Sequence, residues 1–163
     1  GVASGGGAIF GGTGGVMESA LRTANLILAG DKDGIGKKRI DFKKVRGMAG
    51  IREAVIDIAG NKLRVAVVNG IGNIKYILDR LDKFDYIEVM SCPGGCIGGG
   101  GQPIPTNNEI RKKRIAALYS IDTKSKVRIS GENPNAVMIT DWMKKNSKKK
   151  STLHTKYNKK TKY

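Results

Sequence analysis

The residues best suited to chemistry are two cysteines, Cys92 and Cys96, four positions apart in a glycine-rich segment. Residues 88–103 read Glu-Val-Met-Ser-Cys-Pro-Gly-Gly-Cys-Ile-Gly-Gly-Gly-Gly-Gln-Pro and hold six of the 23 glycines of the chain. Thiolates are the soft ligands that iron–sulfur clusters require. Glycines remove side-chain bulk and let backbone N–H groups approach an anionic group closely. The segment therefore predicts a site for a bulky inorganic cofactor; the alternative is a mobile glycine loop with two structural thiols.

The two cysteines supply only part of such a site. Their Cys-x-x-x-Cys spacing differs from the Cys-x-x-Cys of thioredoxin-type redox sites, and no second ligand pair completes a tetrahedral zinc site. Two cysteines without a secretory context also do not indicate a disulfide framework. The remaining interpretations are shared ligation of a cluster, with further ligands from elsewhere, or two inert thiols.

The elements that must position the cysteines are predicted to be a β-hairpin, a helix and a strand. Strands over 54–58 and 63–68 flank the turn Ala-Gly-Asn-Lys. A helix over 71–83 follows, and a strand over 86–90 leads to Cys92. This arrangement favours an α/β fold with the site outside the carboxyl end of a strand. The buried face of the 71–83 helix is predicted to contain Ile74, Ile77, Leu78 and Leu81.

Further elements are predicted on both sides of this core. A helix over 16–28 ends at Ala29-Gly30, and a short strand is predicted over 42–46. After Pro105, helices are predicted over 109–120, capped by Asn107 or Asn108, and over 134–146. The apolar face of the first helix is predicted to contain Met17, Ala20, Leu21, Ala24 and Leu28. The inward residues of the last helix are predicted to be Val137, Met138 and Trp142.

Size and charge restrict the class of protein. The chain has 163 residues, enough for one domain with a real core, and no apolar run long enough to span a membrane. Its formal net charge is +16, and residues 141–163 hold nine lysines and one acid. Such a surface suits an acidic electron-transfer partner or, less well, nucleic acid, because no base-stacking aromatic pattern accompanies the lysines. The start, Gly-Val-Ala-Ser, is expected to be internal to a longer protein.

The cysteine segment resembles the third H-cluster motif of the FeFe-hydrogenases, and the resemblance extends over nearly the whole chain. It departs from the family at Ser91, where alanine is usual, and at Gly131, where histidine is usual. The other resembling segments are Ser4 to Thr23, Val45-Arg-Gly47 with Gly50-Ile-Arg-Glu53, Val65-Ala-Val-Val68, Arg114 to Tyr119, Glu132-Asn-Pro134 and Leu153-His-Thr-Lys-Tyr157.

The resemblance implies an H-cluster, which is a 4Fe–4S cubane bridged to a diiron subsite. Cys92 would ligate the cubane, and Cys96 would ligate the cubane and bridge to the diiron subsite. Met90 would pack near the diiron centre, and Phe10 and Gly11 would line the pocket of its carbonyl and cyanide ligands. A dry apolar wall there would limit solvent access and tune the potential of the metal. The expected surroundings of the cofactor also include Pro93, Gly94 and Gly95.

The resemblance further implies an α/β fold that is half of an iron-only hydrogenase catalytic domain, with a mixed sheet, flanking helices and a helical C-terminal wrap. Residues 1–105 would form the C-terminal lobe of the H-cluster domain, and residues 106–163 a small-subunit-like region with a basic tail. The family's first two motifs, which hold the other cubane cysteines, do not occur here. The isolated chain is therefore expected to be inactive without the N-terminal half.

The implied activity is reversible H2 oxidation and proton reduction, with ferredoxin or an NAD(P)H-linked subunit as electron partner and a cytoplasmic location. One alternative is a non-enzymatic iron–sulfur assembly protein resembling the nuclear prelamin A recognition factor, and another is a basic nucleic-acid-binding module. The roles of two residues are left open: Glu88 is either a buried hydrogen-bonding carboxylate or outward facing, and His154 is either a metal ligand or, preferably, a packing or hydrogen-bonding residue. A nucleotide site in the glycines of residues 1–15 is disfavoured, because no Gly-Lys-Ser/Thr follows them.

Overall fold

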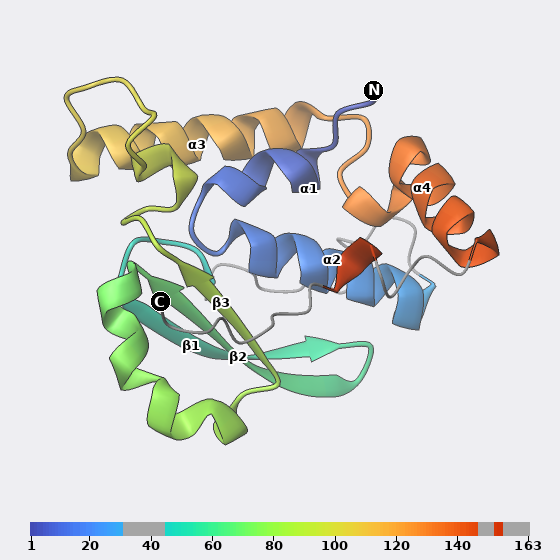
Figure 1. Ribbon diagram of the computed structural model, residues 1–163, viewed down its shortest axis with the longest axis horizontal. Coiled ribbons are helices and arrows are strands. Elements are labelled where there is room, and N and C mark those ends of the chain that lie inside the picture. The colour runs from blue at the N-terminus through green and yellow to red at the C-terminus, as the bar shows by residue number, and fades with distance from the viewer. Residues whose placement is uncertain (31–44, 147–151, 155–163) are drawn as a thin grey trace, which may run out of the picture.

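The chain folds as a small mixed sheet with helices on both of its faces (Figure 1). The computed structural model describes residues 1–30, 45–146 and 152–154. Within these ranges no helix has the combination of length and apolar character needed to cross a membrane. The α-helices and strands are α1 (Gly5–Ala8), α2 (Gly15–Ala29), β1 (Ile51–Ile58), β2 (Asn61–Asn69), β3 (Tyr86–Met90), α3 (Asn108–Lys124) and α4 (Pro134–Lys145). The 3-10 helices are η1 (Ile9–Gly11), η3 (Ile71–Tyr76), η4 (Leu78–Lys83), η5 (Cys96–Gly98) and η6 (Ser130–Glu132).

The predicted hairpin is confirmed, with longer strands than expected. β1 and β2 pair antiparallel, and Ile58 lies opposite Asn61 at the turn. The two turn residues, Ala59 and Gly60, have φ angles of 52° and 86°. Positive φ at both central residues of a two-residue turn matches the right-handed twist of the strands that it joins.

The predicted β-α-β connection is also present. β2 and β3 run parallel, with η3 and η4 as the crossover between them. Asn69 at the end of β2 is in register with Met90 at the end of β3. Because parallel strands end at the same edge of a sheet, the last residues of both strands lie beside the loop that carries the cysteines.

The core lies on both faces of the sheet, and β2 is the strand buried on both. Val65 and Val67 point to the face covered by α2, while Ala66 and Val68 point to the face covered by η3 and η4. This alternation follows from the two-residue period of a strand. The buried cluster on the α2 side of the sheet consists of Met17, Leu21, Val45, Ile56, Ile58, Val65 and Val67.

α2 matches the predicted helix, but its buried face is only partly the predicted one. Met17 and Leu21 are buried, and Gly30 ends the helix in a left-handed conformation with φ of 62°. Ala20 and Leu28, which were predicted to face inward, are exposed, because the helix also buries polar residues on a second side. The strand predicted over 42–46 lies mostly outside the described residues, and Val45 and Arg46 are not in a strand.

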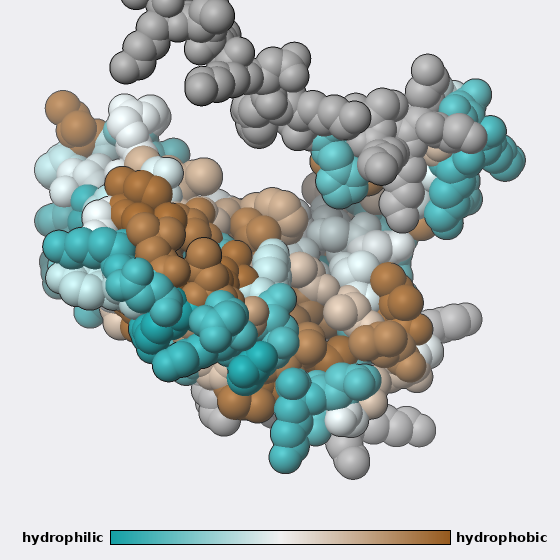
Figure 2. All heavy atoms as spheres, turned by 60° about the horizontal axis from the view of Figure 1, so that its bottom comes forward, coloured by the Kyte–Doolittle hydropathy of each residue, from teal (hydrophilic) through white to brown (hydrophobic). Residues whose placement is uncertain are grey.

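The segment 71–83 is helical, but it forms two 3-10 helices instead of one α-helix. A 3-10 helix has three residues per turn, so residues three apart share a face. Ile74 and Ile77 accordingly pack inward, whereas Leu78 and Leu81 are exposed, contrary to the prediction. Figure 2 shows a band of hydrophobic side chains across the face that carries this segment.

The C-terminal region is helical, as predicted. α3 extends four residues beyond the predicted end and is capped by Asn107, whose side chain accepts a hydrogen bond from the Ile110 N–H at 2.9 Å. The inward face predicted for α4 is wrong, since Val137, Met138 and Trp142 are all exposed. Met143 is the buried residue of α4, which means that the helix presents a different side of its wide apolar stripe to its neighbours. Of the Lys-rich stretch 147–163, the structure describes only 152–154.

Candidate functional site

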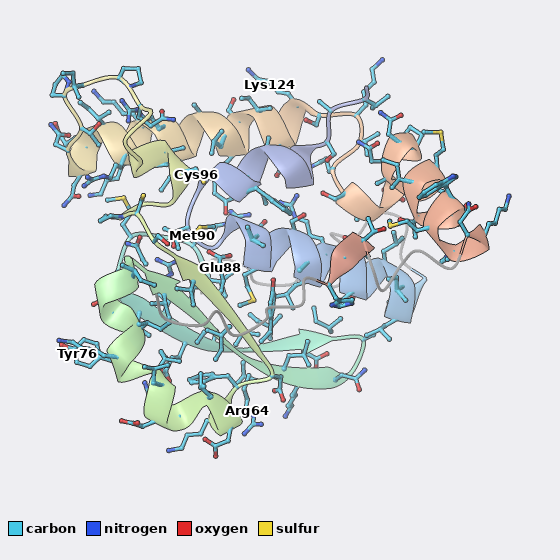
Figure 3. All side chains as sticks on the ribbon, in the orientation of Figure 1. Arg64, Tyr76, Glu88, Met90, Cys96 and Lys124 are labelled. Carbon is cyan, nitrogen blue, oxygen red and sulfur yellow. The ribbon has the colours of Figure 1, made fainter. Side chains whose placement is uncertain are left out.

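The cysteine loop, defined here as residues 91–103, contains Cys92 and Cys96 and follows the end of β3. Figure 3 labels Met90 at the end of this strand and Cys96 in the loop. Both cysteines are free thiols; Cys92 is half-buried and Cys96 is exposed. Gly94 and Gly95 between them have φ angles of 88° and 91°, which side-chain-bearing residues rarely adopt. The loop therefore turns through glycine, as the sequence predicts, and presents one thiol on each side of the turn.

A second glycine-rich segment packs directly against this loop. The glycine turn, residues 11–15, joins η1 to α2, and the Thr13 N–H donates to the Gly94 carbonyl at 3.0 Å. A Cβ atom on Gly95 would lie 2.8 Å from the Gly11 carbonyl oxygen and 2.9 Å from the Thr13 nitrogen. Backbone meets backbone here, so glycine at position 95 is required for the close approach. The predicted site residues Gly11, Gly94 and Gly95 are thus brought together.

Asn69 fixes the middle of the cysteine loop from the end of β2. Its Oδ1 atom accepts a hydrogen bond from the Gly94 N–H at 2.7 Å, and its Nδ2 atom donates to the Met48 carbonyl at 2.8 Å. The sequence analysis did not identify this residue. Its signal was weak but present, because a polar residue directly after an apolar strand lies at the edge where the site was expected.

Of the two roles considered for Glu88, the structure shows the first: Glu88 is a buried, hydrogen-bonding carboxylate. It is 5 % exposed, and it accepts hydrogen bonds from the N–H groups of Gly14 and Met17 at 2.5 and 2.6 Å. Burial raises the pKa of Glu88, while the backbone hydrogen bonds from Met17 and Gly14 and the nearby Arg52 oppose that rise. Because the first N–H groups of a helix carry partial positive charge, the carboxylate fastens β3 to the start of α2.

Arg114 of α3 holds the far side of the cysteine loop. Its Nη1 atom donates to the Ile97 carbonyl at 2.8 Å, and its Nη2 atom donates to the Pro103 carbonyl at 2.7 Å. Arg111, one turn earlier, lies against Gly94 and Gly98, and its Nε–H is buried without a hydrogen-bond partner. The sequence analysis assigned Arg111 no role, and it named Arg114 only as the start of a segment that resembles the family.

The donor set fits half of an iron–sulfur site. Among the described residues no group of three or more His, Cys, Asp or Glu side chains could hold a metal, so Cys92 and Cys96 are joined by no third such side chain. His154 is exposed and belongs to no such group. A Cβ on Gly99 would lie 3.6 Å from the Cys92 sulfur, so glycine keeps the space beside that thiol open. These features are consistent with a bulky cofactor that is ligated on its other side by different residues.

The apolar residues predicted to surround the cofactor lie at the margins of the loop. Met90 ends β3 and is half-buried, and Phe10 lies in η1 with 44 % of its surface exposed. Pro93 is exposed between the two cysteines. Their proximity to a cofactor stays a prediction.

A second cluster of ionisable side chains lies between α2 and α3. Asp122 accepts hydrogen bonds from both terminal nitrogens of Arg22, at 2.7 and 2.9 Å, and Glu18 accepts one from Arg22 at 2.6 Å. Burial raises the pKa of Tyr119, whose hydroxyl donates to Glu18 at 2.9 Å. This charge network consists of Glu18, Arg22, Arg46, Tyr119, Asp122 and Arg128.

Two family models match the chain in succession. Residues 1–100 match the C-terminal domain of the iron only hydrogenase large subunit, and residues 108–160 match the iron hydrogenase small subunit. The first match ends at residue 100, inside the cysteine loop, and the second begins at residue 108, where α3 begins.

Individual relatives agree with these matches. The NADP-reducing hydrogenase subunit HndD of Solidesulfovibrio fructosivorans is 41 % identical over 96 % of this chain, which spans 27 % of that protein. The solved structure of FeFe-hydrogenase HydA1 from Chlamydomonas reinhardtii is 37 % identical with a TM-score of 0.55, covering 81 % of this chain and 40 % of that one. The nuclear prelamin A recognition factor of Xenopus laevis is 30 % identical over 58 % of this chain and 22 % of that protein. The chain thus spans well under half of the proteins that it resembles.

Proposed function

The chain belongs to the iron-only hydrogenase family, and we propose that it holds one side of an H-cluster in an enzyme that interconverts H2 with protons and electrons. The main observation that supports this proposal is the pair of free thiols, Cys92 and Cys96, in a glycine-rich loop with no third ligand among the described residues. A 4Fe–4S cubane takes four cysteine ligands. The two missing ligands would come from the N-terminal half of the catalytic domain.

Each part of the chain has a proposed task at the cofactor. Cys92 and Cys96 would ligate the cubane, with Cys96 also facing the diiron subsite. Met90 and Phe10 would exclude water from that side, and Gly11, Pro93, Gly94 and Gly95 would shape the cradle. The H-cluster supplies the redox chemistry when it is bound. The protein supplies fixed sulfur donors and a dry, backbone-lined surface.

The proposal also divides the chain and names its partners. Residues 1–105 would be the cofactor-bearing lobe, and residues 106–163 the small-subunit-like region. The first partner is the N-terminal half, without which the chain would be inactive, and the second is ferredoxin or an NAD(P)H-linked subunit. Lys112 and Lys113 are exposed on α3 beside the cysteine loop, so an acidic electron carrier would be attracted to this side. We place the enzyme in the cytoplasm as part of this proposal.

The test uses the completed protein, meaning this chain joined to or co-expressed with a hydrogenase N-terminal half and matured anaerobically. We expect H2 evolution and bound iron, with both lost in Cys96→Ala. Ser91→Ala is the matched control, because Ser91 is an exposed neighbour in the same loop. Unchanged iron content in Cys96→Ala would contradict the proposal.

The second candidate is an iron–sulfur assembly protein, favoured by the 30 % identity to the nuclear prelamin A recognition factor. The same preparation separates the two. An assembly protein would contain a cubane but no diiron subsite and would evolve no H2. A hydrogenase would show the infrared bands of carbonyl and cyanide ligands.

A further inference from the structure

We propose that Arg114 is a positioning residue for the iron-binding cysteines, because its guanidinium group bonds both ends of the glycine-rich half of the cysteine loop. The inference rests on the proposed function, since it concerns how the loop holds a cluster. It goes beyond that function by assigning part of the cofactor site to the region that matches the small subunit, residues 108–160. That region would then contribute to the site as well as covering the lobe.

The geometry joins both ends of one flexible segment. Arg114 donates to the Ile97 carbonyl at 2.8 Å and to the Pro103 carbonyl at 2.7 Å. Ile97 directly follows Cys96, and its own side chain is 7 % exposed. Between the two carbonyls lie four consecutive glycines and Gln102. A single planar group therefore fixes the start and the end of this stretch.

The stretch has little else to hold it. Glycine has the greatest backbone freedom of all residues, so a run of four is ordered only at a large entropic cost. Short turns provide some hydrogen bonds, from the N–H groups of Gly98, Gly99 and Gln102. Those turns do not use the carbonyls of Ile97 and Pro103. Arg114 donates to both, and the Pro103 carbonyl also accepts a longer bond from the Thr106 hydroxyl at 3.2 Å. The rigid fork of the guanidinium matches two acceptors at once, which the single ammonium of lysine cannot do.

Arg111 extends this contact along the loop. Residues three apart share one side of an α-helix, so Arg111 and Arg114 face the loop together. A Cβ on Gly94 would lie 3.1 Å from the Arg111 Cδ atom, and a Cβ on Gly98 would lie 3.0 Å from the Arg111 Nε atom. The Arg111 side chain thus packs against Gly94 and Gly98 of the loop, and Arg114 of the same helix bonds the loop further along the chain.

The proposal predicts that cluster binding depends on the fork of Arg114 and not merely on its charge. In the completed protein we expect Arg114→Met to retain iron roughly 10–100-fold less well against a chelator, as expected when a group that orients metal ligands is removed. Arg114→Lys, which keeps the charge and can reach one carbonyl, should be intermediate. Lys124→Met is the matched control, because Lys124 is an exposed lysine with the same charge at the other end of the same helix.

Electron paramagnetic resonance of the reduced cubane and its midpoint potential give readouts that overall stability does not move. A change in Arg114→Met beyond that in Lys124→Met supports the proposal. Wild-type spectrum, potential and iron retention in both Arg114 variants would overturn it, even if thermal stability falls. If Arg114→Met does not fold, Arg114→Lys decides alone. Absence of iron from the wild-type completed protein would instead overturn the proposed function, and this inference with it.

Discussion

The cysteine loop and the charge network differ in whether their reactive side chains have partners within the chain. In the charge network, carboxylates pair with guanidinium groups: Asp122 accepts from both terminal nitrogens of Arg22 at 2.7 and 2.9 Å, and from the Nη2 and Nε atoms of Arg128 at 2.7 and 3.4 Å. The Arg22 Nε–H is buried without a hydrogen-bond partner, but the charge of its guanidinium group is paired. In the cysteine loop, side chains from the surroundings bond only backbone groups, and the two thiols stay free. Buried charges that are paired with opposite charges serve the fold, whereas free thiols in a glycine-lined loop point to a ligand.

Exposure supports the same distinction. Glu18, Arg22 and Asp122 are each at most 1 % exposed, although they are charged. Cys96 is exposed, although free cysteine is among the most often buried residue types. The network consequently belongs to the structure that joins α2 to α3, and the loop belongs to the site.

The largest effect should come from breaking the charge network at its centre. Asp122→Ala leaves Arg22 buried beside one remaining carboxylate, and removing one partner of a buried pair costs about 3–5 kcal/mol in unfolding free energy. Urea unfolding of the completed protein without cofactor measures this loss. Asp141→Ala is the control, because Asp141 forms only an exposed pair with Lys144 at 3.6 Å.

The same carboxylate should make the stability of the wild type depend on pH. Burial acts to raise the pKa of Asp122, but the hydrogen bonds from Arg22 and Arg128 outweigh it and hold the pKa below its usual value. Its contribution is therefore complete above the unfolded pKa of about 4 and is lost as the pH falls through the lower folded value. The difference between wild type and Asp122→Ala should shrink in that acidic range. A constant difference would show that the ion pairs contribute little.

A smaller effect is expected from filling the contact between the cysteine loop and the glycine turn. Gly95 has φ 91° and ψ −158°, a region open essentially to glycine alone, and a Cβ there would strike backbone atoms. Gly95→Ala should cost roughly 2–4 kcal/mol, because strain and overpacking each cost about 1–3. It should also lower the iron content of the completed protein.

Gly100→Ala provides the matched control in the same loop, since a Cβ at that position meets nothing within 4 Å. Loss of iron in Gly95→Ala, with iron retained in Gly100→Ala, would show that the contact with the glycine turn positions the cysteine loop. Equal iron contents in the two variants would mean that the glycine turn does not position the loop.

The sequence predicted features that depend on local chemistry. The turn at Gly60 and the end of α2 at Gly30 require positive φ, which a sequence reveals through glycine. The cysteine loop was likewise visible from its composition. The parallel pairing of β2 with β3 followed from the helical segment between them.

Features that depend on tertiary packing were missed. Hydropathy places Glu18 and Arg22 at the surface, but both are buried because, besides pairing with each other, they pair with Arg46 and Asp122 from more distant parts of the chain. The predictions of which side of residues 71–83 and of α4 faces inward were also wrong because of tertiary packing. A wide apolar stripe offers several faces, and only the neighbouring elements decide which one is buried. Arg114 could not be identified because its two acceptors are backbone carbonyls, which leave no trace in the sequence.

The smallest predicted effect tests whether Glu88 belongs to the site or only to the fold. Glu88→Gln keeps one acceptor oxygen and turns an amide group toward an N–H donor, so one of the bonds to Gly14 and Met17 is lost. An unpaired buried donor costs about 1–3 kcal/mol. Glu53→Gln is the matched control, because Glu53 lies on β1 in an exposed pair with Arg80 at 2.7 Å.

The expected result for Glu88→Gln depends on whether Glu88 acts with the cysteine loop or, like the charge network, only in the fold. If Glu88 holds β3 and the cysteine loop in register with the glycine turn, Glu88→Gln should alter the electron paramagnetic resonance of the cubane as well as stability. If Glu88 resembles the charge network, only the unfolding free energy should change. Because burial raises the pKa of Glu88, protonation at low pH should imitate the variant at a higher pH than for an exposed glutamate. A wild-type cluster spectrum in Glu88→Gln at all pH values would assign this carboxylate to the fold and confine the site to residues that contact the loop itself.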